Sequence, residues 1–156
     1  MSITVPIELG FEFEVKASAK DVFTVLSDVP VSASHYPHVE RLVDLGGGAY
    51  RWEMESIGVG TIQLQTVYAS KYVSNKARGT VVWTPVDGEG NARVSGSWTI
   101  TANKKSTHIV LQVDAELSLP LPALMKMVVA PLVEAEFERL TKRYIANLIE
   151  RFGGEV

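Results

Sequence analysis

The sequence contains no cysteine among its 156 residues. This absence excludes a disulfide framework, a thiolate zinc site and a cysteine nucleophile. The sequence also lacks a basic excess, because 15 Lys and Arg stand against 18 Asp and Glu, which gives a formal net charge of −3. A nucleic-acid-binding surface needs such an excess, so we expect no nucleic acid among the partners.

Long apolar runs are missing as well. The longest one, 117–133, is interrupted by Lys126 and by three prolines, whereas a membrane-spanning helix needs about 20 apolar residues in succession. Met1–Gly10 has neither a basic start nor a long apolar run. We therefore expect no signal peptide, no integral membrane association and a cytoplasmic location.

No cofactor motif or metal-ligand spacing is present. The glycine-rich segments Gly58–Gly60 and Asp87–Asn91 lack the lysine and the strand-to-helix context of a phosphate loop, and they predict hairpin turns. His35, His38 and Glu40 do not follow a recognised metal-ligand spacing. The sequence thus predicts no cofactor and no metal.

Size and composition indicate a globular protein. Residues 1–156 have a mass of 17.1 kDa, which corresponds to a single domain. Apolar residues make up 46% of the chain and charged residues 21%, which is ordinary for a folded domain. A chain of this length buries close to 70% of its unfolded surface, enough to form a core without disulfides.

The beginning of the chain predicts a strand followed by two short helices. Ile7–Val15 alternates apolar and polar residues, the period of a strand with one buried face. Ser18–Asp21 is a capping box, in which a hydroxyl and a carboxylate three residues later begin a helix. Asp28 and Pro30 predict the end of that helix, and Val31–Tyr36 predicts a second short helix.

The middle of the chain predicts strands joined by short turns. Consecutive alternating segments of this kind indicate an antiparallel meander with one polar face. The predicted strands are Val39–Leu45, Tyr50–Met54, Ile62–Tyr68, a segment around Val81 and Trp83 that Asp87–Asn91 ends, Arg93–Ile100 and His108–Leu117.

The last segment changes to a helical period. Apolar residues recur at intervals of three and four, which predicts a long amphipathic helix that Pro131 starts or kinks and Gly153 ends. They are Val133, Phe137, Leu140, Tyr144, Leu148 and Phe152.

These elements combine into one architecture. A sheet with one apolar face and a single long apolar helix can bury both surfaces only against each other. We therefore predict an α+β fold in which a curved antiparallel sheet of about seven strands wraps around the C-terminal helix, with two short helices after the first strand. The space between a strongly twisted sheet and one helix can remain a cavity.

In this order of elements the sequence resembles the helix-grip fold of the START and birch-pollen-allergen-like superfamily (SRPBCC). It is more similar to the bacterial polyketide cyclase/dehydrase and lipid-transport branch. Phe13–Asp28 resembles the family's opening strand and capped helix, and Tyr36–Val39 its aromatic-proline turn. Leu119–Pro122 and Val129–Val133 resemble its closing segment. The resemblance implies a buried cavity for a small apolar molecule, and the family offers no universal catalytic motif.

Three functions are compatible with this resemblance. The first is binding or transport of a small hydrophobic molecule, such as a lipid, quinone or polyketide, and the second is a cyclase or dehydratase that uses the same cavity. The third is an interaction module with a filled core, and the sequence leaves the oligomeric state open. The expected ligand-binding residues are Phe11, Phe13, Trp52, Met54, Leu64, Thr66, Tyr68, Trp83, Trp98, Leu111, Val113, Val129, Val133, Phe137 and Leu140.

Hydroxyl groups on the apolar face are candidates for polar contacts with a ligand. Tyr50, Thr66 and Tyr68 share the apolar face of their strands, where each hydroxyl needs a hydrogen-bond partner. A ligand carbonyl could be that partner. Alternatively, each hydroxyl binds a backbone group or a buried water, or points out at the rim.

Candidate acids and bases are few. His35 could act near neutral pH at a cavity mouth, although loop histidines are usually solvated. Glu136 lies beside the apolar stripe of the long helix, and burial there would raise its pKa and suit a general acid. Alternatively, Glu136 pairs on the surface with Arg139 or Arg143. Together with Tyr68, these residues are the catalytic candidates for the cyclase hypothesis.

Overall fold

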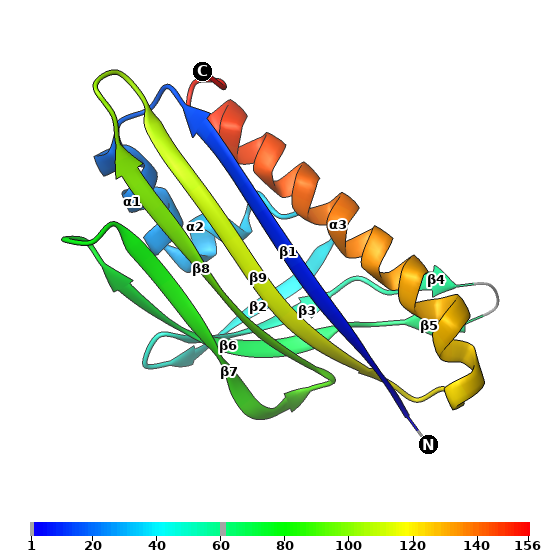
Figure 1. Cartoon of the computed structure of the whole chain (residues 1–156). Coiled ribbons are helices and arrows are strands. Elements are labelled where there is room, and N and C mark those ends of the chain that lie inside the picture. The colour runs from blue at the N-terminus through cyan, green and yellow to red at the C-terminus, as the bar shows by residue number, and fades with distance from the viewer. Residues whose placement is uncertain (1, 60–61) are drawn as a thin grey trace.

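The fold consists of strands, short helices and one long helix in the predicted order (Figure 1). A computed structural model describes residues 2–59 and 62–156. The elements are β1 (Ile3–Val15), α1 (Ala19–Ser27), α2 (Val29–Ala33), β2 (Val39–Gly46), β3 (Ala49–Met54), β4 (Ile57–Val59), β5 (Ile62–Leu64), β6 (Val67–Asn75), β7 (Thr80–Gly90), β8 (Ala92–Ala102), β9 (Thr107–Leu119), the 3-10 helix η1 (Ala123–Met125) and α3 (Lys126–Arg151).

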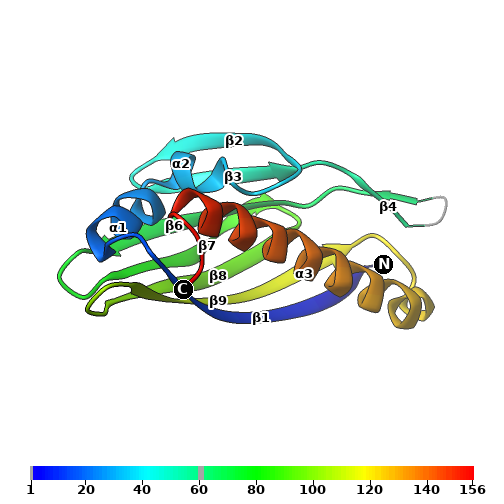
Figure 2. The same cartoon turned by 90° about the horizontal axis from the view of Figure 1, so that it is seen from above.

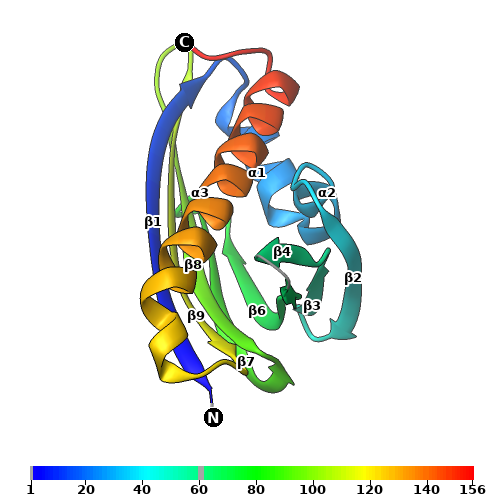
Figure 3. The ribbon, with the colours of Figure 1, turned by 90° about the vertical axis from the view of Figure 1, so that its right-hand side faces the viewer.

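The main sheet has seven strands in the order β1-β9-β8-β7-β6-β3-β2, and all neighbours are antiparallel. It curves from β1 on one side to β2 on the other, with α3 and α2 inside the curve (Figure 3). From above, α3 crosses the inner face while α1 and α2 lie beside one end of it (Figure 2). The predicted α+β helix-grip fold is thus confirmed.

The two short helices are capped by side chains. The Ser18 hydroxyl accepts a hydrogen bond from the Asp21 backbone N–H at 3.2 Å, as the capping box predicts. The Asp28 carboxylate caps α2 in the same way, by accepting from the Val31 N–H at 3.3 Å. The predicted bounds of α2 were wrong, because the helix covers Val29–Ala33. Pro30 occupies its first turn, where a missing N–H costs no intrahelical hydrogen bond.

The predicted strand Ile62–Tyr68 is divided into β5 and β6, with β5 in a separate two-stranded sheet with β4. The Asn91 side chain explains the division. Its amide donates to the Gln65 carbonyl at 2.9 Å and accepts from the Val67 N–H at 2.9 Å, so that it takes the place of a strand neighbour. Gly58 lies within β4 rather than in a turn. The predicted turn at Gly60 lies outside the described residues.

The turn after β7 is shorter than predicted. β7 continues through Asp87 to Gly90, and the chain reverses at Gly90 and Asn91. Gly90 has φ +79°, and a Cβ atom there would lie 2.0 Å from the Val67 carbonyl oxygen. Only glycine fits this close approach of two backbones.

The long helix begins earlier than predicted. α3 starts at Lys126, directly after η1, and contains Pro131 in its second turn. A proline removes only one backbone donor, and the turns on either side still hydrogen-bond. The helix buries Val129, Val133 and Leu148 against the sheet. In the described part of the chain, no helix is both long and apolar enough to cross a bilayer.

Two apolar clusters fill the ends of the space between α3 and the sheet. One contains Val15, Ile109 and Leu148 at the C-terminal end of α3. The other contains Val5 and Val129 at its N-terminal end. The middle of this space is therefore the place where the packing can leave an opening.

A glycine allows one cavity wall to form. Trp83 of β7 is paired with Gly96 of β8, and a Cβ atom on Gly96 would lie 2.5 Å from both the Trp83 ring and the Gln112 carbonyl oxygen. The indole thus lies directly over the neighbouring strand.

We predict that Gly96→Ala lowers the free energy of unfolding by about 1–3 kcal/mol, because either the indole or β9 has to move. The control is Gly10→Ala, whose new methyl group would meet only the end of the flexible Gln112 side chain, at 3.1 Å. Urea denaturation measures both variants. Equal stability of the two variants would show that Trp83 does not depend on Gly96.

Candidate functional site

A cavity lies between the inner face of the sheet, α2 and α3. Its volume is about 100 Å³, whereas one water needs about 10–15 Å³ on the same measure. The cavity therefore has room for a small molecule. Its walls are Ile7, Leu9, Leu26, Val29, Ser32, Tyr36, Trp52, Met54, Thr66, Tyr68, Tyr72, Trp83, Ala92, Val94, Trp98, Leu111, Val113, Ala115, Leu117, Phe137, Thr141 and Tyr144.

Aromatic and aliphatic side chains together form most of the walls. Eight of the thirteen aromatic residues of the chain line this one cavity: three Trp, four Tyr and one Phe. Trp52 stacks on Tyr68 with ring centres 5.7 Å apart, and the edge of Tyr36 meets Trp52 at 5.9 Å. Tyr144 contacts Tyr36 at 5.0 Å and Trp98 at 5.9 Å. The rings hold one another in place at offset-stacked and edge-to-face distances.

Most polar groups of the walls are already hydrogen-bonded to the protein. The hydroxyls of Ser32 and Tyr144 bind each other and connect α2 to α3. The Tyr36 hydroxyl lies 3.2 Å from that of Thr141. These two contacts, together with the indole N–H that Trp52 donates to Tyr72 at 2.9 Å, restrain the orientation of the rings.

Two hydroxyls on the walls differ from the others. Among residues 2–59 and 62–156, no hydrogen bond to the hydroxyl of Thr66 or Tyr68 is found. Every fully enclosed side-chain nitrogen or oxygen in this part of the chain does have a partner. The Thr66 and Tyr68 hydroxyls are therefore not fully enclosed by protein, and both residues line the cavity. They lie two residues apart, just before and at the start of β6.

Burial keeps the tyrosines of the cavity protonated. It raises the pKa of Tyr36 from 10.0 to about 12, because water no longer solvates the phenolate. Burial also raises the pKa values of Tyr68, Tyr72 and Tyr144 well above the ordinary value. At neutral pH, these phenols are neutral hydrogen-bond donors.

No charged side chain belongs to the described walls of the cavity. Charges begin at a smaller neighbouring cavity between α3 and the end of β3, which shares three residues with the main one. It is lined by His38, Met54, Glu55, Thr66, Glu136, Phe137 and Leu140. There, His38 Nδ1 lies 3.2 Å from the Glu55 carboxylate. This neighbouring cavity marks the side on which the main one meets polar surface.

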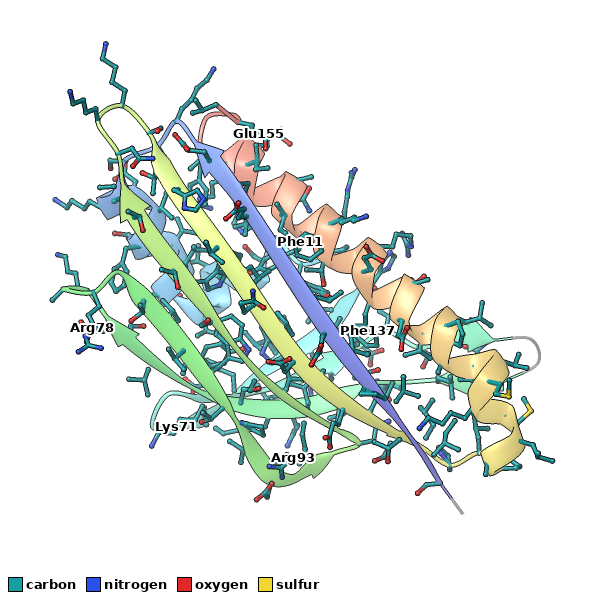
Figure 4. All side chains as sticks on the ribbon, viewed as in Figure 1. Phe11, Lys71, Arg78, Arg93, Phe137 and Glu155 are labelled. Atoms are coloured by element: carbon teal, nitrogen blue, oxygen red, sulfur yellow. The ribbon has the colours of Figure 1, made fainter. Side chains whose placement is uncertain are left out.

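Figure 4 shows where some of the charged side chains lie on the strands. Lys71, Arg78 and Arg93 extend from the strands on the side of the molecule away from α3. Phe137, by contrast, comes from α3 and belongs to the cavity wall. Within the described residues, no group of three His, Asp or Glu side chains is arranged to hold a metal ion.

Nine of the predicted ligand-binding residues line the cavity: Trp52, Met54, Thr66, Tyr68, Trp83, Trp98, Leu111, Val113 and Phe137. Leu140 lines the smaller neighbouring cavity. The remaining five lie in the apolar clusters at the two ends of α3 and are not part of the cavity wall. These are Phe11 and Phe13 in one cluster, and Leu64, Val129 and Val133 in the other.

The structure separates the three catalytic candidates. Only Tyr68 lines the main cavity. His35 Nδ1 lies 2.9 Å from the Val31 carbonyl oxygen, outside the cavity wall, and this acceptor requires Nδ1 to carry a proton. Glu136 accepts hydrogen bonds from Arg139 at 2.5 and 3.2 Å, and this contact lowers the pKa of Glu136 rather than raising it. The surface pairing that the sequence allowed is thus what the structure shows.

Several wall residues were not among the predicted site residues. Tyr72 follows Tyr68 by four residues on β6 and so faces the same side, which is a signal that the sequence contains. Thr141 and Tyr144 follow Phe137 at helical spacing and share its face of α3. Ser32 and Tyr36 had no such signal, because their positions depend on how α2 meets α3.

Comparison with known proteins adds independent findings. The profile of the family described as polyketide cyclase / dehydrase and lipid transport matches residues 7–148. No curated protein matches the chain.

Solved structures share the fold at low sequence identity. A START superfamily protein from Mycobacterium smegmatis has a TM-score of 0.69 and 17% identity, over 94% of this chain and 97% of that one. The Zhui aromatase/cyclase from Streptomyces sp. R1128 has a TM-score of 0.60 and 16% identity, over 93% and 90%. Norcoclaurine synthase from Thalictrum flavum has a TM-score of 0.58 and 19% identity, over 94% and 94%. At these identities the likeness concerns the fold alone. Because the family profile spans nearly the whole chain, the chain belongs to the polyketide cyclase / dehydrase and lipid transport family.

Proposed function

We propose that this protein binds and carries a small hydrophobic molecule in the cavity between α3 and the sheet. The observation that supports this most directly is the cavity of about 100 Å³ with predominantly apolar and aromatic walls. Binding sites for small molecules are typically such cavities, with a few polar groups that orient the ligand. A cavity of this size also argues against an interaction module with a filled core.

A cyclase or dehydratase remains the alternative, because the fold is shared with an aromatase/cyclase. This reaction needs an acid or base in contact with the substrate. His35 and Glu136 do not line the main cavity, and Tyr68 is a weak acid there because burial raises its pKa. The described walls thus favour a carrier. A carrier would return its ligand unchanged, and mass spectrometry of the extracted ligand after incubation distinguishes the two functions.

Filling the cavity should abolish binding. We predict that Val113→Phe weakens the binding of N-phenyl-1-naphthylamine, a neutral fluorescent probe, by at least about tenfold, because the new ring occupies the ligand's space. The matched control is Gln112→Phe on the same strand, since Gln112 is exposed on the outer face. Probe fluorescence titrated with each protein gives the Kd.

Two outcomes would contradict the proposed function. One is the absence of saturable binding to the unmodified protein across a panel of apolar compounds. The other is equal weakening by Val113→Phe and Gln112→Phe, which would place the bound probe outside the cavity. A thermal-shift series serves as an independent check, because ligand at 100 times its Kd adds about 2.7 kcal/mol of stability.

The buried tyrosines also predict the alkaline limit of stability. Tyr36 has a folded pKa of about 12, above the ordinary value of 10.0, so its contribution is complete below pH 10 and is lost as the pH rises toward 12. We predict that Tyr36→Phe reduces this alkaline loss, by up to about 3 kcal/mol. Urea midpoints between pH 8 and pH 12 measure it. Identical alkaline losses in both proteins would show that Tyr36 ionises freely in the folded state.

A further inference from the structure

We propose that the ligand is a neutral, flat aromatic molecule with one hydrogen-bonding oxygen, and that the Tyr68 and Thr66 hydroxyls select that oxygen. This inference rests on the proposed function and specifies its ligand class. Three independent properties of the cavity wall support it: the arrangement of its rings, its lack of charge, and the two hydroxyls that the protein leaves unused.

The ring arrangement favours a flat aromatic ligand over a flexible chain. The plane of Trp52 is within 12° of that of Tyr68, and Tyr72 and Trp83 form a second pair at 5.5 Å. The hydrogen bond from Trp52 to Tyr72 links one ring of each pair. A rigid wall of ring faces and edges matches another ring, which gains stacking contacts and loses little conformational freedom on binding. An alkyl chain gains no such contacts and has to be ordered.

The lack of charge favours a neutral ligand. The described walls offer no Lys, Arg or His to pair with an anion, and no Asp or Glu to pair with a cation. An unpaired charge taken out of water into such surroundings carries a large desolvation penalty. Burial in the same walls raises the pKa values of Tyr68 and Tyr144 for the same reason. A fatty acid carboxylate would meet the same obstacle.

Among the described wall hydroxyls, two are free to bind the ligand's oxygen. Ser32, Tyr36, Thr141 and Tyr144 use their hydroxyls within the protein. The hydroxyls of Tyr68 and its near neighbour Thr66 are left without a partner among the described residues and border the cavity. A ligand carbonyl or hydroxyl oxygen beside either hydroxyl could accept a hydrogen bond from it.

The face of Tyr68 then orients the ligand's ring system. Tyr68 is stacked on Trp52. This contact restrains the plane of the Tyr68 ring and therefore the position of its hydroxyl. The oxygen position and the ring position of the ligand are therefore set by the same side chain. This makes Tyr68 a specificity-determining residue whose hydroxyl can be removed without removing the stacked ring.

Four probes of related size separate the three properties. The neutral aromatic ketone is 2-acetylnaphthalene, and naphthalene lacks its oxygen. The acyclic ketone 2-dodecanone has the same number of carbons as 2-acetylnaphthalene. The anion 2-naphthoate carries a negative charge on the naphthalene ring system. We expect 2-acetylnaphthalene to bind at least about tenfold more tightly than each of the other three, as measured by calorimetry.

Variants test the two hydroxyls. Tyr68→Phe keeps the ring on Trp52, and Thr66→Val keeps the shape of the side chain. Each should weaken the binding of 2-acetylnaphthalene by about fivefold to tenfold while leaving that of naphthalene unchanged. Tyr50→Phe is the control, since Tyr50 is not part of the cavity wall.

The outcomes distinguish the inference from the function on which it rests. If 2-dodecanone or 2-naphthoate binds as tightly as 2-acetylnaphthalene, the ligand class is wrong, while binding in the cavity stands. If Tyr68→Phe and Thr66→Val weaken both naphthalenes equally, the hydroxyls do not select the oxygen. If no probe binds the unmodified protein, and the apolar panel shows no binding either, the proposed function itself is overturned.

Discussion

The pairing of the first strand with the last one determines the rest of the structure. β1 and β9 form an unbroken antiparallel ladder from Ile3↔Leu119 to Val15↔Thr107. This ladder brings the N-terminal strand, which is far from β9 in the sequence, to the edge over which α3 returns. A short connection from β9 to α3 then leaves the helix only the inner face of the sheet. Side chains of β1 and β9 fill the space beside each end of α3. The middle of α3 instead faces the cavity.

The side chains around that middle region resolve a conflict between size and polarity. Large rings are needed to reach across the space, yet Tyr and Trp bring polar atoms into a mostly apolar region. The protein satisfies them in pairs, as with Ser32 and Tyr144, because a buried polar group without a partner is costly. Each pair also connects two elements, so the same contacts that satisfy the hydroxyls hold α2 and α3 at a fixed separation. The same hydrogen bonds therefore make the walls rigid and keep the cavity open.

The sequence predicted the fold well where local patterns decide it, and less well where distant groups do. Alternation along the strands and the period of α3 follow from one buried face, so the sheet and the helix were predictable. The division between β5 and β6 was not, because it depends on the side chain of Asn91, which follows Thr66 by 25 positions in the sequence. For the site, the strand residues that line the cavity belong to the apolar faces that alternation predicts. The sequence could not show which of them meet open space, since Phe13 and Trp98 have the same pattern and only Trp98 reaches the cavity.

The opening in the middle of the core affects how much of the protein a cell maintains. Empty interior volume means dispersion contacts that are not made, at roughly 24 cal/mol per Å³, so an opening of about 100 Å³ corresponds to a deficit on the order of 2 kcal/mol. A bound molecule restores those contacts. Differences of this size change steady-state abundance several-fold, because proteases and chaperones act on the transiently unfolded fraction. The cellular level of this protein would then follow the supply of the molecule that fills it.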